Sequence, residues 1–177
     1  MRTERLVVGF LKTNCYIVHD GKCAVVIDPG ANAQGILDIL RENELSLKYI
    51  FLTHAHFDHV LAVKPIAEAT GAKICASKGE RERMRDAEMS GHTMLRNREF
   101  IPISADEELS ENKDICVGEM TFSVIETPGH TEGSVCIICE NSLFSGDTLF
   151  FGSCGRCDLA GGNYEDMKSS LKKLYNL

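Results

Sequence analysis

The sequence predicts an α/β protein in which two β-layers face each other and helices lie outside them. Two observations support this class. Apolar, β-branched runs alternate with helix-like runs over residues 14–76, which indicates a mixed sheet, and a second series of short strands over residues 115–145 precedes a final helix. We expect one domain over residues 1–177, which is long enough for a substantial core.

The first half begins with three consecutive strands, and Asp20-Gly21 between the last two is typical of a hairpin turn. We expect these strands over Arg5–Phe10, Asn14–His19 and Cys23–Asp28. Apolar residues at helical spacing and compact apolar runs then alternate. In chain order they predict a helix over Ala31–Asn43, a strand over Tyr49–Thr53, a helix over Val60–Ala69 and a strand over Lys73–Ala76.

Residues 77–97 are charged and rich in methionine, which suits one or two exposed helices with a solvated face. The alternative hypothesis is a rim or lid over a site, with Met84, Met89 and Met94 as adaptable contacts. We expect His92 to lie on the surface.

The second half contains four more short runs of strand-like composition, followed by one helix with an apolar stripe. The strands are expected over Ile115–Val117, Thr121–Ile125, Ser134–Cys139 and Ser142–Ser145, and the helix over Asn163–Leu174.

Charge and composition narrow the classes of partner. Nineteen Lys and Arg against 26 Asp and Glu give a net charge of −7, which disfavours nucleic acid and anionic membranes as partners. No apolar run is long enough to span a bilayer, and no secretory signal is visible, so we expect a cytoplasmic protein whose eight cysteines are reduced. Cys15, Cys23, Cys75 and Cys116 read as small apolar residues within strands.

Four metal-binding side chains occur within six residues at the end of the predicted strand Tyr49–Thr53. They are His54, His56, Asp58 and His59. A single histidine here would be read as a solvated loop residue, but this density is not typical of a loop. Imidazole and carboxylate together suit zinc, iron or manganese, and the ends of strands are where α/β sheets form their sites.

Two further turns present one potential ligand each. Pro128-Gly129 precedes His130 after one strand, and Gly146 precedes Asp147 after another. Each alone would be read as a surface turn or hairpin. A carboxylate such as Asp147 suits a pair of cations because it can offset charge on both.

The run His54-Ala-His56-Phe-Asp58-His59, followed by His130 and Asp147, resembles the H-x-H-x-D-H pattern of the metallo-β-lactamase superfamily. The resemblance implies a four-layer αββα sandwich of two mixed β-sheets with outer helices. It also implies two divalent metal ions, with zinc as the expected metal and iron or manganese as alternatives. The implied ligands are His54, His56, His130 and Asp147 for metal one, and Asp58, His59 and Asp147 for metal two.

Within that superfamily, the stretch Gly146–Arg156 is most similar to short, single-domain members of the glyoxalase II (hydroxyacylglutathione hydrolase) group. This similarity implies an enzyme in which a metal-bound hydroxide attacks a thioester carbonyl. Asp58 would be catalytic, orienting the hydroxide, and Arg156 would contact the substrate. The partner would be a small-molecule thioester.

Two departures from the family pattern matter. The family places one more histidine ligand after the last helix, whereas this chain has no histidine after His130. Three explanations are open: the chain is truncated after Leu177, the terminal segment comes from elsewhere, or the second metal binds weakly. We expect truncation, with the last C-terminal strand missing, because an unpaired sheet edge is a liability. The helical extension that helps glyoxalase II to bind glutathione is also missing, which leaves the thiol carrier and the acyl group open.

Three alternatives stay open at this point. A mononuclear iron persulfide dioxygenase would use His54, His130 and Asp147. A lactonase or β-lactamase would use the same hydroxide, and a binding protein would not turn over at all. The pairs Cys136/Cys139 and Cys154/Cys157 have spacing found in zinc ribbons, but we expect cysteines of the core or rim there.

Overall fold

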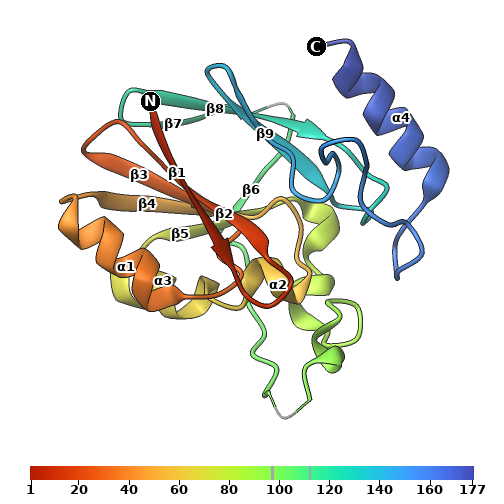
Figure 1. The fold of residues 1–177 in the computed structure, drawn as a ribbon, viewed down its shortest axis with the longest axis horizontal. Helices are drawn as coiled ribbons and strands as arrows, with labels where there is room; N and C mark the ends of the chain where they lie inside the picture. Colours follow the sequence, from red (N-terminus) through yellow and green to blue (C-terminus); the bar gives the residue numbers. More distant parts are fainter. Residues whose placement is uncertain (97, 112) are drawn as a thin grey trace.

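The computed structural model describes residues 1–96, 98–111 and 113–177. Two β-sheets pack face to face, helices α1 and α3 cover the outside of the first sheet, and α4 lies against the second (Figure 1). The predicted four-layer α/β sandwich is therefore confirmed.

The first sheet has six strands whose order in space is their order in the chain. They are β1 (Arg2–Val8), β2 (Thr13–His19), β3 (Cys23–Ile27), β4 (Ser46–Phe51), β5 (Lys73–Ala76) and β6 (Glu107–Glu108). The first three strands are antiparallel, and β3 to β6 are parallel. Because β3 and β4 are parallel neighbours, the residues that follow them, Asp28 and Thr53, meet at one edge of the sheet.

The second sheet has four strands in the order β10-β9-β8-β7, and every pair is antiparallel. These strands are β7 (Ile115–Val117), β8 (Met120–Glu126), β9 (Val135–Cys139) and β10 (Ser142–Phe144). In the described part of the chain, β10 is followed by loops and by α4 (Tyr164–Tyr175), without a later strand.

Two of the helices, α1 and α4, begin at an asparagine side-chain cap. The Asn32 side chain accepts the Gly35 N–H at the start of α1 (Ala33–Glu42). Asn163 accepts the N–H groups of Glu165 and Asp166 at the start of α4, which satisfies two of the free donors of its first turn. The remaining helices are α2 (Phe57–Val60) and α3 (Val63–Thr70).

Successive side chains of the central strands point to opposite faces of the first sheet, so they belong to two separate apolar cores. Val26 of β3 packs in the core beneath α1 and α3, whereas its neighbours Val25 and Ile27 pack in the core between the sheets. In the second core, Phe51 of β4 and Phe122 of β8 meet edge to face, with ring centroids 5.2 Å apart. This contact ties the sheet that carries most of the candidate ligands to the second sheet.

The segment after β5 differs from the predicted exposed helices. It contains three short 3₁₀ turns, Lys78–Glu80, Arg83–Arg85 and His92–Met94, and several of its side chains are buried. The prediction that His92 lies on the surface is wrong, because its ring is buried and its Nε2 lies 3.1 Å from the Arg98 carbonyl. Asn97, the last residue of that predicted segment, lies outside the described residues.

Other differences concern the ends of elements. The first strand lies at Arg2–Val8, so Phe10 is in the following turn and 68% exposed. The predicted helix Val60–Ala69 is two helices, and α2 begins inside the metal-binding run, at Phe57. The short strand β6 was not predicted, and Cys116 is exposed rather than buried because it faces outward on an edge strand.

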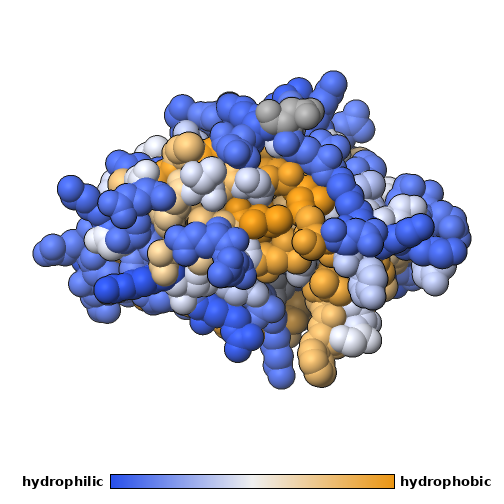
Figure 2. Space-filling model, turned by 90° about the horizontal axis from the view of Figure 1, so that it is seen from above, coloured by the Kyte–Doolittle hydropathy of each residue, from blue (hydrophilic) through white to orange (hydrophobic). Residues whose placement is uncertain are grey.

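The surface of the molecule is not uniformly polar. Seen from above, a broad hydrophobic area occupies the middle of the face, beside the hydrophilic right-hand end where α4 lies (Figure 2). None of the described helices combines the length and the apolar composition that crossing a membrane requires.

Phe122→Ala tests the contact between the sheets. Phe122 is fully buried, so its loss should lower the free energy of unfolding by about 3–5 kcal/mol, measured by urea denaturation. Phe151→Ala is the matched control, because this side chain is fully exposed, and it should leave the unfolding midpoint unchanged. Equal midpoints for both variants would contradict the assigned core.

Candidate metal centre

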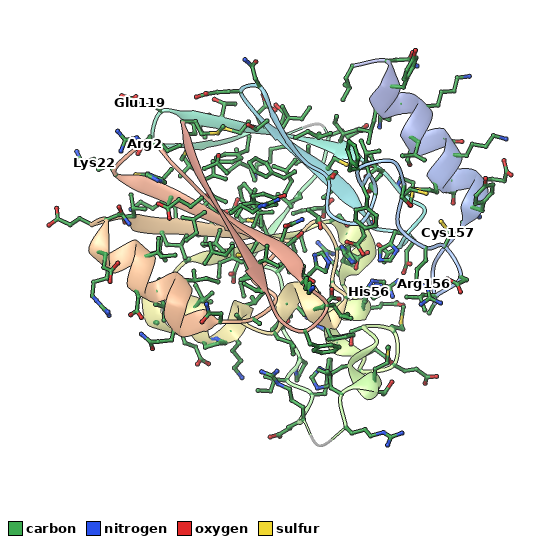
Figure 3. All side chains as sticks on the ribbon, viewed as in Figure 1. Arg2, Lys22, His56, Glu119, Arg156 and Cys157 are labelled. Carbon is green, nitrogen blue, oxygen red and sulfur yellow. The ribbon has the colours of Figure 1, made fainter. Side chains whose placement is uncertain are left out.

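The predicted metal ligands come together at one edge of the sandwich. His54, His56, Asp58 and His59 follow β4, while His130 follows β8 and Asp147 follows β10. His56 and His130 are 74 residues apart in the chain, and their loops meet in space. His56 and Arg156 lie on the same side of the molecule (Figure 3).

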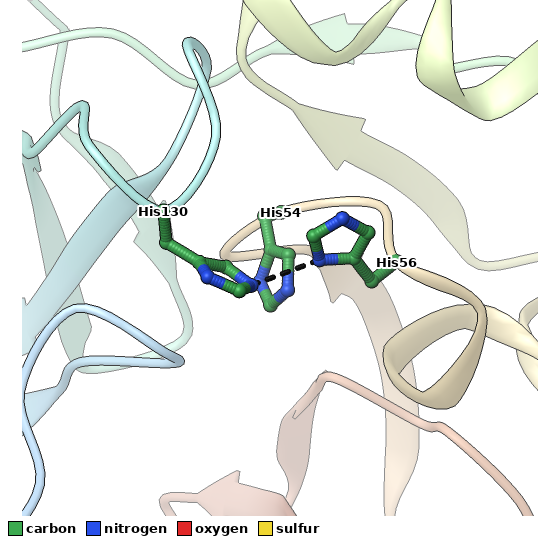
Figure 4. A group of neighbouring side chains, drawn as sticks. All are labelled: His54, His56 and His130. Atoms are coloured by element: carbon green, nitrogen blue, oxygen red, sulfur yellow. Dashed lines mark hydrogen bonds between the residues drawn. The ribbon is translucent and has the colours of Figure 1, made fainter. Parts of the chain in front are cut away.

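Three imidazoles form a first group of potential ligands. His54, His56 and His130 offer nitrogen atoms that all lie within 4.8 Å of one another. His56 Nδ1 is 2.9 Å from His130 Nε2 (Figure 4). Two ring nitrogens that face each other at this distance need a proton or a cation between them, since two lone pairs would repel.

A second group consists of His54, His59 and Asp147. Asp147 lies between the groups, because its Oδ1 is 3.3 Å from His59 Nε2 and its Oδ2 is 3.5 Å from His130 Nε2. Asp58 Oδ2 is also 3.5 Å from His59 Nε2. Asp147 therefore lies between the two groups, and its role as a bridging ligand stays a prediction. His54 belongs to both groups rather than to one.

The protonation of these rings fits metal binding. The Thr53 hydroxyl donates to Asp28, so the Nδ1–H of His54 donates to Thr53 Oγ1 at 3.2 Å. His54 Nε2 then carries a lone pair, and within the described residues this buried atom has no hydrogen-bond partner. His130 Nδ1 likewise donates to the Arg156 carbonyl at 2.7 Å, which leaves its Nε2 free to act as a ligand.

Burial also keeps two of the rings neutral. It lowers the pKa of His56 to about 3, and burial together with the nearby histidines holds the pKa of His54 well below its usual range. A metal ion binds neutral imidazole, so at neutral pH these two ligands need not lose a proton first. The donor set, the orphaned His54 Nε2 and these protonation states together fit divalent metal ions.

Asp28 is a functional residue that sequence reasoning missed. Its buried carboxylate accepts the backbone N–H and the hydroxyl of Thr53, at 2.8 and 2.6 Å, and the Nδ1–H of His59 at 3.0 Å. Burial alone would lower the pKa of His59, but Asp28 and Asp147 hold it well above its usual range. The signal available in the sequence was an aspartate directly before Pro29-Gly30 at the end of a strand. In the structure Asp28 has a φ of +51°.

Two glycines allow the loops to approach closely. Gly146 has a φ of +49°, and a Cβ there would lie 2.2 Å from Thr53 Oγ1. A Cβ on Gly155 would lie 1.9 Å from the Asp147 carbonyl oxygen and 3.1 Å from His130 Nδ1. The residue that approaches Gly146 is Thr53, the threonine that orients His54.

A buried ion pair, also missed from the sequence, joins the ligand loops. Glu80 accepts the N–H of Ala55, which lies between His54 and His56, at 2.8 Å, and the hydroxyl of Thr131, next to His130, at 2.6 Å. Burial raises the pKa of Glu80, although these two donors and Arg83 oppose the rise.

Arg83, the partner of Glu80, extends the connection to two more loops. Both side chains are fully buried, and Arg83 Nε lies 3.1 Å from Glu80 Oε2. The guanidinium donates to the carbonyls of Met89 and Ala160, at 2.6 and 3.0 Å, and to Glu132 at 2.7 Å. One ion pair thus fixes four segments around the candidate ligands. The charged composition of residues 77–97 gave no sign of this burial.

Arg156 lies on the rim of the site. Its guanidinium makes two hydrogen bonds to Asp158, at 2.6 and 2.7 Å, while its carbonyl orients His130. Its role as a substrate contact stays a prediction.

All eight cysteines are free, and in the described residues none belongs to a group of potential metal ligands.

Two cavities reach the ligand groups. One, of about 360 Å³, is bounded by His56, His130 and Asp147. The other, of about 470 Å³, is bounded by Asp28, His59 and Asp147. Both volumes fall within the range of ligand pockets, so a small substrate could reach the candidate metals from either side.

A four-layer sandwich with two histidine-rich ligand groups at its strand ends defines a metal-dependent hydrolase. The sequence profile of the Metallo-beta-lactamase superfamily matches residues 8–177, and the chain belongs to this superfamily.

Similar proteins carry related descriptions. The chain is 34% identical over 181 residues to a probable metallo-hydrolase, YqgX, of Bacillus subtilis, covering 100% of this chain and 85% of that protein. It is also 34% identical over 167 residues to hydroxyacylglutathione hydrolase 1 of Vibrio vulnificus, covering 92% of this chain and 56% of that protein.

Solved structures of similar proteins have the same fold. The BLEG-1 B3 metallo-beta-lactamase superposes with a TM-score of 0.88 at 36% identity, covering 97% of this chain and 84% of that one. TTHA1623 in a di-iron-bound form superposes with a TM-score of 0.85 at 32% identity, covering 98% of this chain and 86% of that one.

Glu80→Gln tests whether the buried ion pair supports the metal centre. It leaves the buried Arg83 charge unbalanced, so we expect a loss of about 3 kcal/mol in the free energy of unfolding, measured with urea. Zinc affinity, measured by competition with a chromophoric chelator, should fall about tenfold or more.

The exposed pair Arg81–Glu108 provides the matched control for that variant. Glu108→Gln should change neither the unfolding midpoint nor zinc affinity. Unchanged zinc affinity in Glu80→Gln would show that the pair stabilises the fold without positioning the ligands.

Proposed function

We propose that this protein hydrolyses thioesters with two divalent metal ions, preferably zinc, which the two ligand groups hold. His54, His56 and His130 would hold one ion, His59 and Asp58 the other, and Asp147 would lie between them. The observation that carries the proposal is the placement of the two oxygens of Asp147, 3.3 Å from His59 and 3.5 Å from His130. The similarity to a hydroxyacylglutathione hydrolase supports the thioester as substrate class.

When bound, such metals supply a water that is acidic enough to ionise near neutral pH and a Lewis acid for the carbonyl oxygen. The chain's own residues prepare that site. Thr13 donates its hydroxyl to Asp58 Oδ2 at 2.6 Å, which fixes the carboxylate that would orient the water. Asp28 and the Arg156 carbonyl fix the rings of His59 and His130 from behind. A thiolate is a good leaving group, so a strong general acid is not required.

A mononuclear iron-dependent oxygenase is the second candidate, because a similar solved structure binds iron, although it holds two ions. It would use His54, His130 and Asp147 and oxidise a thiol persulfide. The iron-loaded protein should then consume oxygen when a glutathione persulfide is added, measured with an oxygen electrode. Oxygen uptake without thioester cleavage would replace the hydrolase proposal.

The first experiment is to load the protein with zinc, count the ions per chain and measure the cleavage of N-acetylcysteamine thioesters. We expect about two ions per chain and turnover that stops when a chelator is added. A protein that binds zinc but cleaves no thioester, while opening a β-lactam, would fit the lactamase alternative instead.

His56→Ala should reduce thioester hydrolysis by about a thousandfold or more, because it removes a ligand from the first group. Circular dichroism should show a folded protein. His19→Gln is the matched control, since His19 lies at the opposite end of β2 from the candidate site. It should keep its turnover, and full activity in His56→Ala would refute the assigned site.

A further inference from the structure

We infer that the cavity beside His56 and Asp147 binds the acyl part of the substrate and favours an apolar acyl chain over a short hydroxyacyl group. This inference rests on the proposed thioester hydrolysis and assigns its substrate class. It follows from the lining of the cavity, from the charges on its rim and from its contrast with the neighbouring cavity.

Apolar side chains from five segments of the chain line the cavity together with the candidate ligands. They are Leu11, Phe57, Met89, Met94, Phe150 and Leu159. His56, Asp58, His130 and Asp147 line the same space. A carbonyl held at the candidate ligands would therefore direct its alkyl substituent among these apolar groups. The volume of about 360 Å³ accommodates a chain of several carbons.

Two polar side chains of this lining, Arg156 and Ser90, already have hydrogen-bond partners. Arg156 is neutralised by its two hydrogen bonds to Asp158, and the Ser90 hydroxyl donates to the Ala87 carbonyl at 3.3 Å. Glu88 adds a negative charge to the rim. A hydroxyl on the acyl group would lose water without a matched partner here, whereas each methylene buried gains about fourfold in affinity.

The neighbouring cavity has the opposite character. Lys12, Asn14, Tyr16, Asp28 and Ser145 contribute to its lining. The two cavities share Asp58, Asp147, Leu11 and Phe150, so they meet at the candidate metal centre. The polar thiol carrier suits this second side, which leaves the apolar side for the acyl chain.

Two methionines make the apolar side adaptable. The Met89 carbonyl is held by Arg83 at 2.6 Å, so its backbone is anchored while its flexible side chain reaches the cavity. Met94 lines the same space and is 68% exposed, which gives an entering chain apolar surface to cover. The hypothesis of a methionine rim thus applies to Met89 and Met94, whereas Met84 is buried in the core.

Binding can be tested without any metal. The chain, labelled with ¹³C in its methionine methyl groups and freed of metal with a chelator, is titrated with S-hexyl-N-acetylcysteamine or with the S-(2-hydroxypropyl) analogue. Both thioethers resist hydrolysis. We expect the NMR signals of Met89 and Met94 to shift, those of the buried Met84, Met120 and Met167 to stay fixed, and the hexyl compound to bind about tenfold more tightly.

Turnover provides the second readout. With zinc-loaded protein, kcat/KM for the hexanoyl thioester of N-acetylcysteamine should exceed that for the lactoyl thioester about tenfold or more. Met94→Ser should reduce this preference severalfold. Leu143→Ser, which changes an exposed apolar residue on β10 outside the cavity, should leave it unchanged.

The outcomes separate the inference from the proposed function. Selective binding of the hexyl compound without cleavage of any thioester would refute thioester hydrolysis and retain an apolar ligand site. Thioester cleavage with equal or greater preference for the lactoyl group, and without shifts at Met89 and Met94, would overturn the acyl assignment alone.

Discussion

The buried pair Glu80–Arg83 is the interaction on which the arrangement of the site depends. A fully buried carboxylate and guanidinium are tolerated only when their remaining donors and acceptors are satisfied. Here the satisfying groups belong to the loops that carry the candidate ligands: Ala55 and Thr131 for Glu80, and the carbonyls of Met89 and Ala160 for Arg83. The requirement to satisfy two buried charges therefore fixes four loops relative to one another.

Asp28 plays a similar part on the other side of the candidate ligands. It joins the end of β3 to Thr53 and His59, and through Thr53 it sets the ring of His54. The parallel pairing of β3 and β4 brings these residues to one edge, where backbone and side-chain donors meet a single carboxylate. The ligands are thus oriented by groups behind them, which is how proteins commonly tune metal sites.

The two cavities differ in polarity, and this difference would fix the orientation of a bound substrate. Because one is lined largely by apolar side chains and the other by polar ones, a substrate with unlike halves would enter in one orientation. Part of the apolar lining comes from Met89 and Met94, which belong to a segment whose charged sequence is typical of a solvated surface. Its position follows from Arg83, which anchors this segment beside the ligands while its charged neighbours face solvent.

The sequence by itself determined the α/β class with two β-layers and the order of most strands and helices, because these depend on local periodicity. It also determined the ligand-bearing turns, because histidines and carboxylates are dense around His54, His130 and Asp147. Only the tertiary structure decided that Asp147 lies between two histidine groups, that His54 is near both, and that Asp28, Glu80 and Arg83 support them. Long-range hydrogen bonds between buried polar side chains have no periodic signature in a sequence, so these contacts become visible only once the loops are placed side by side.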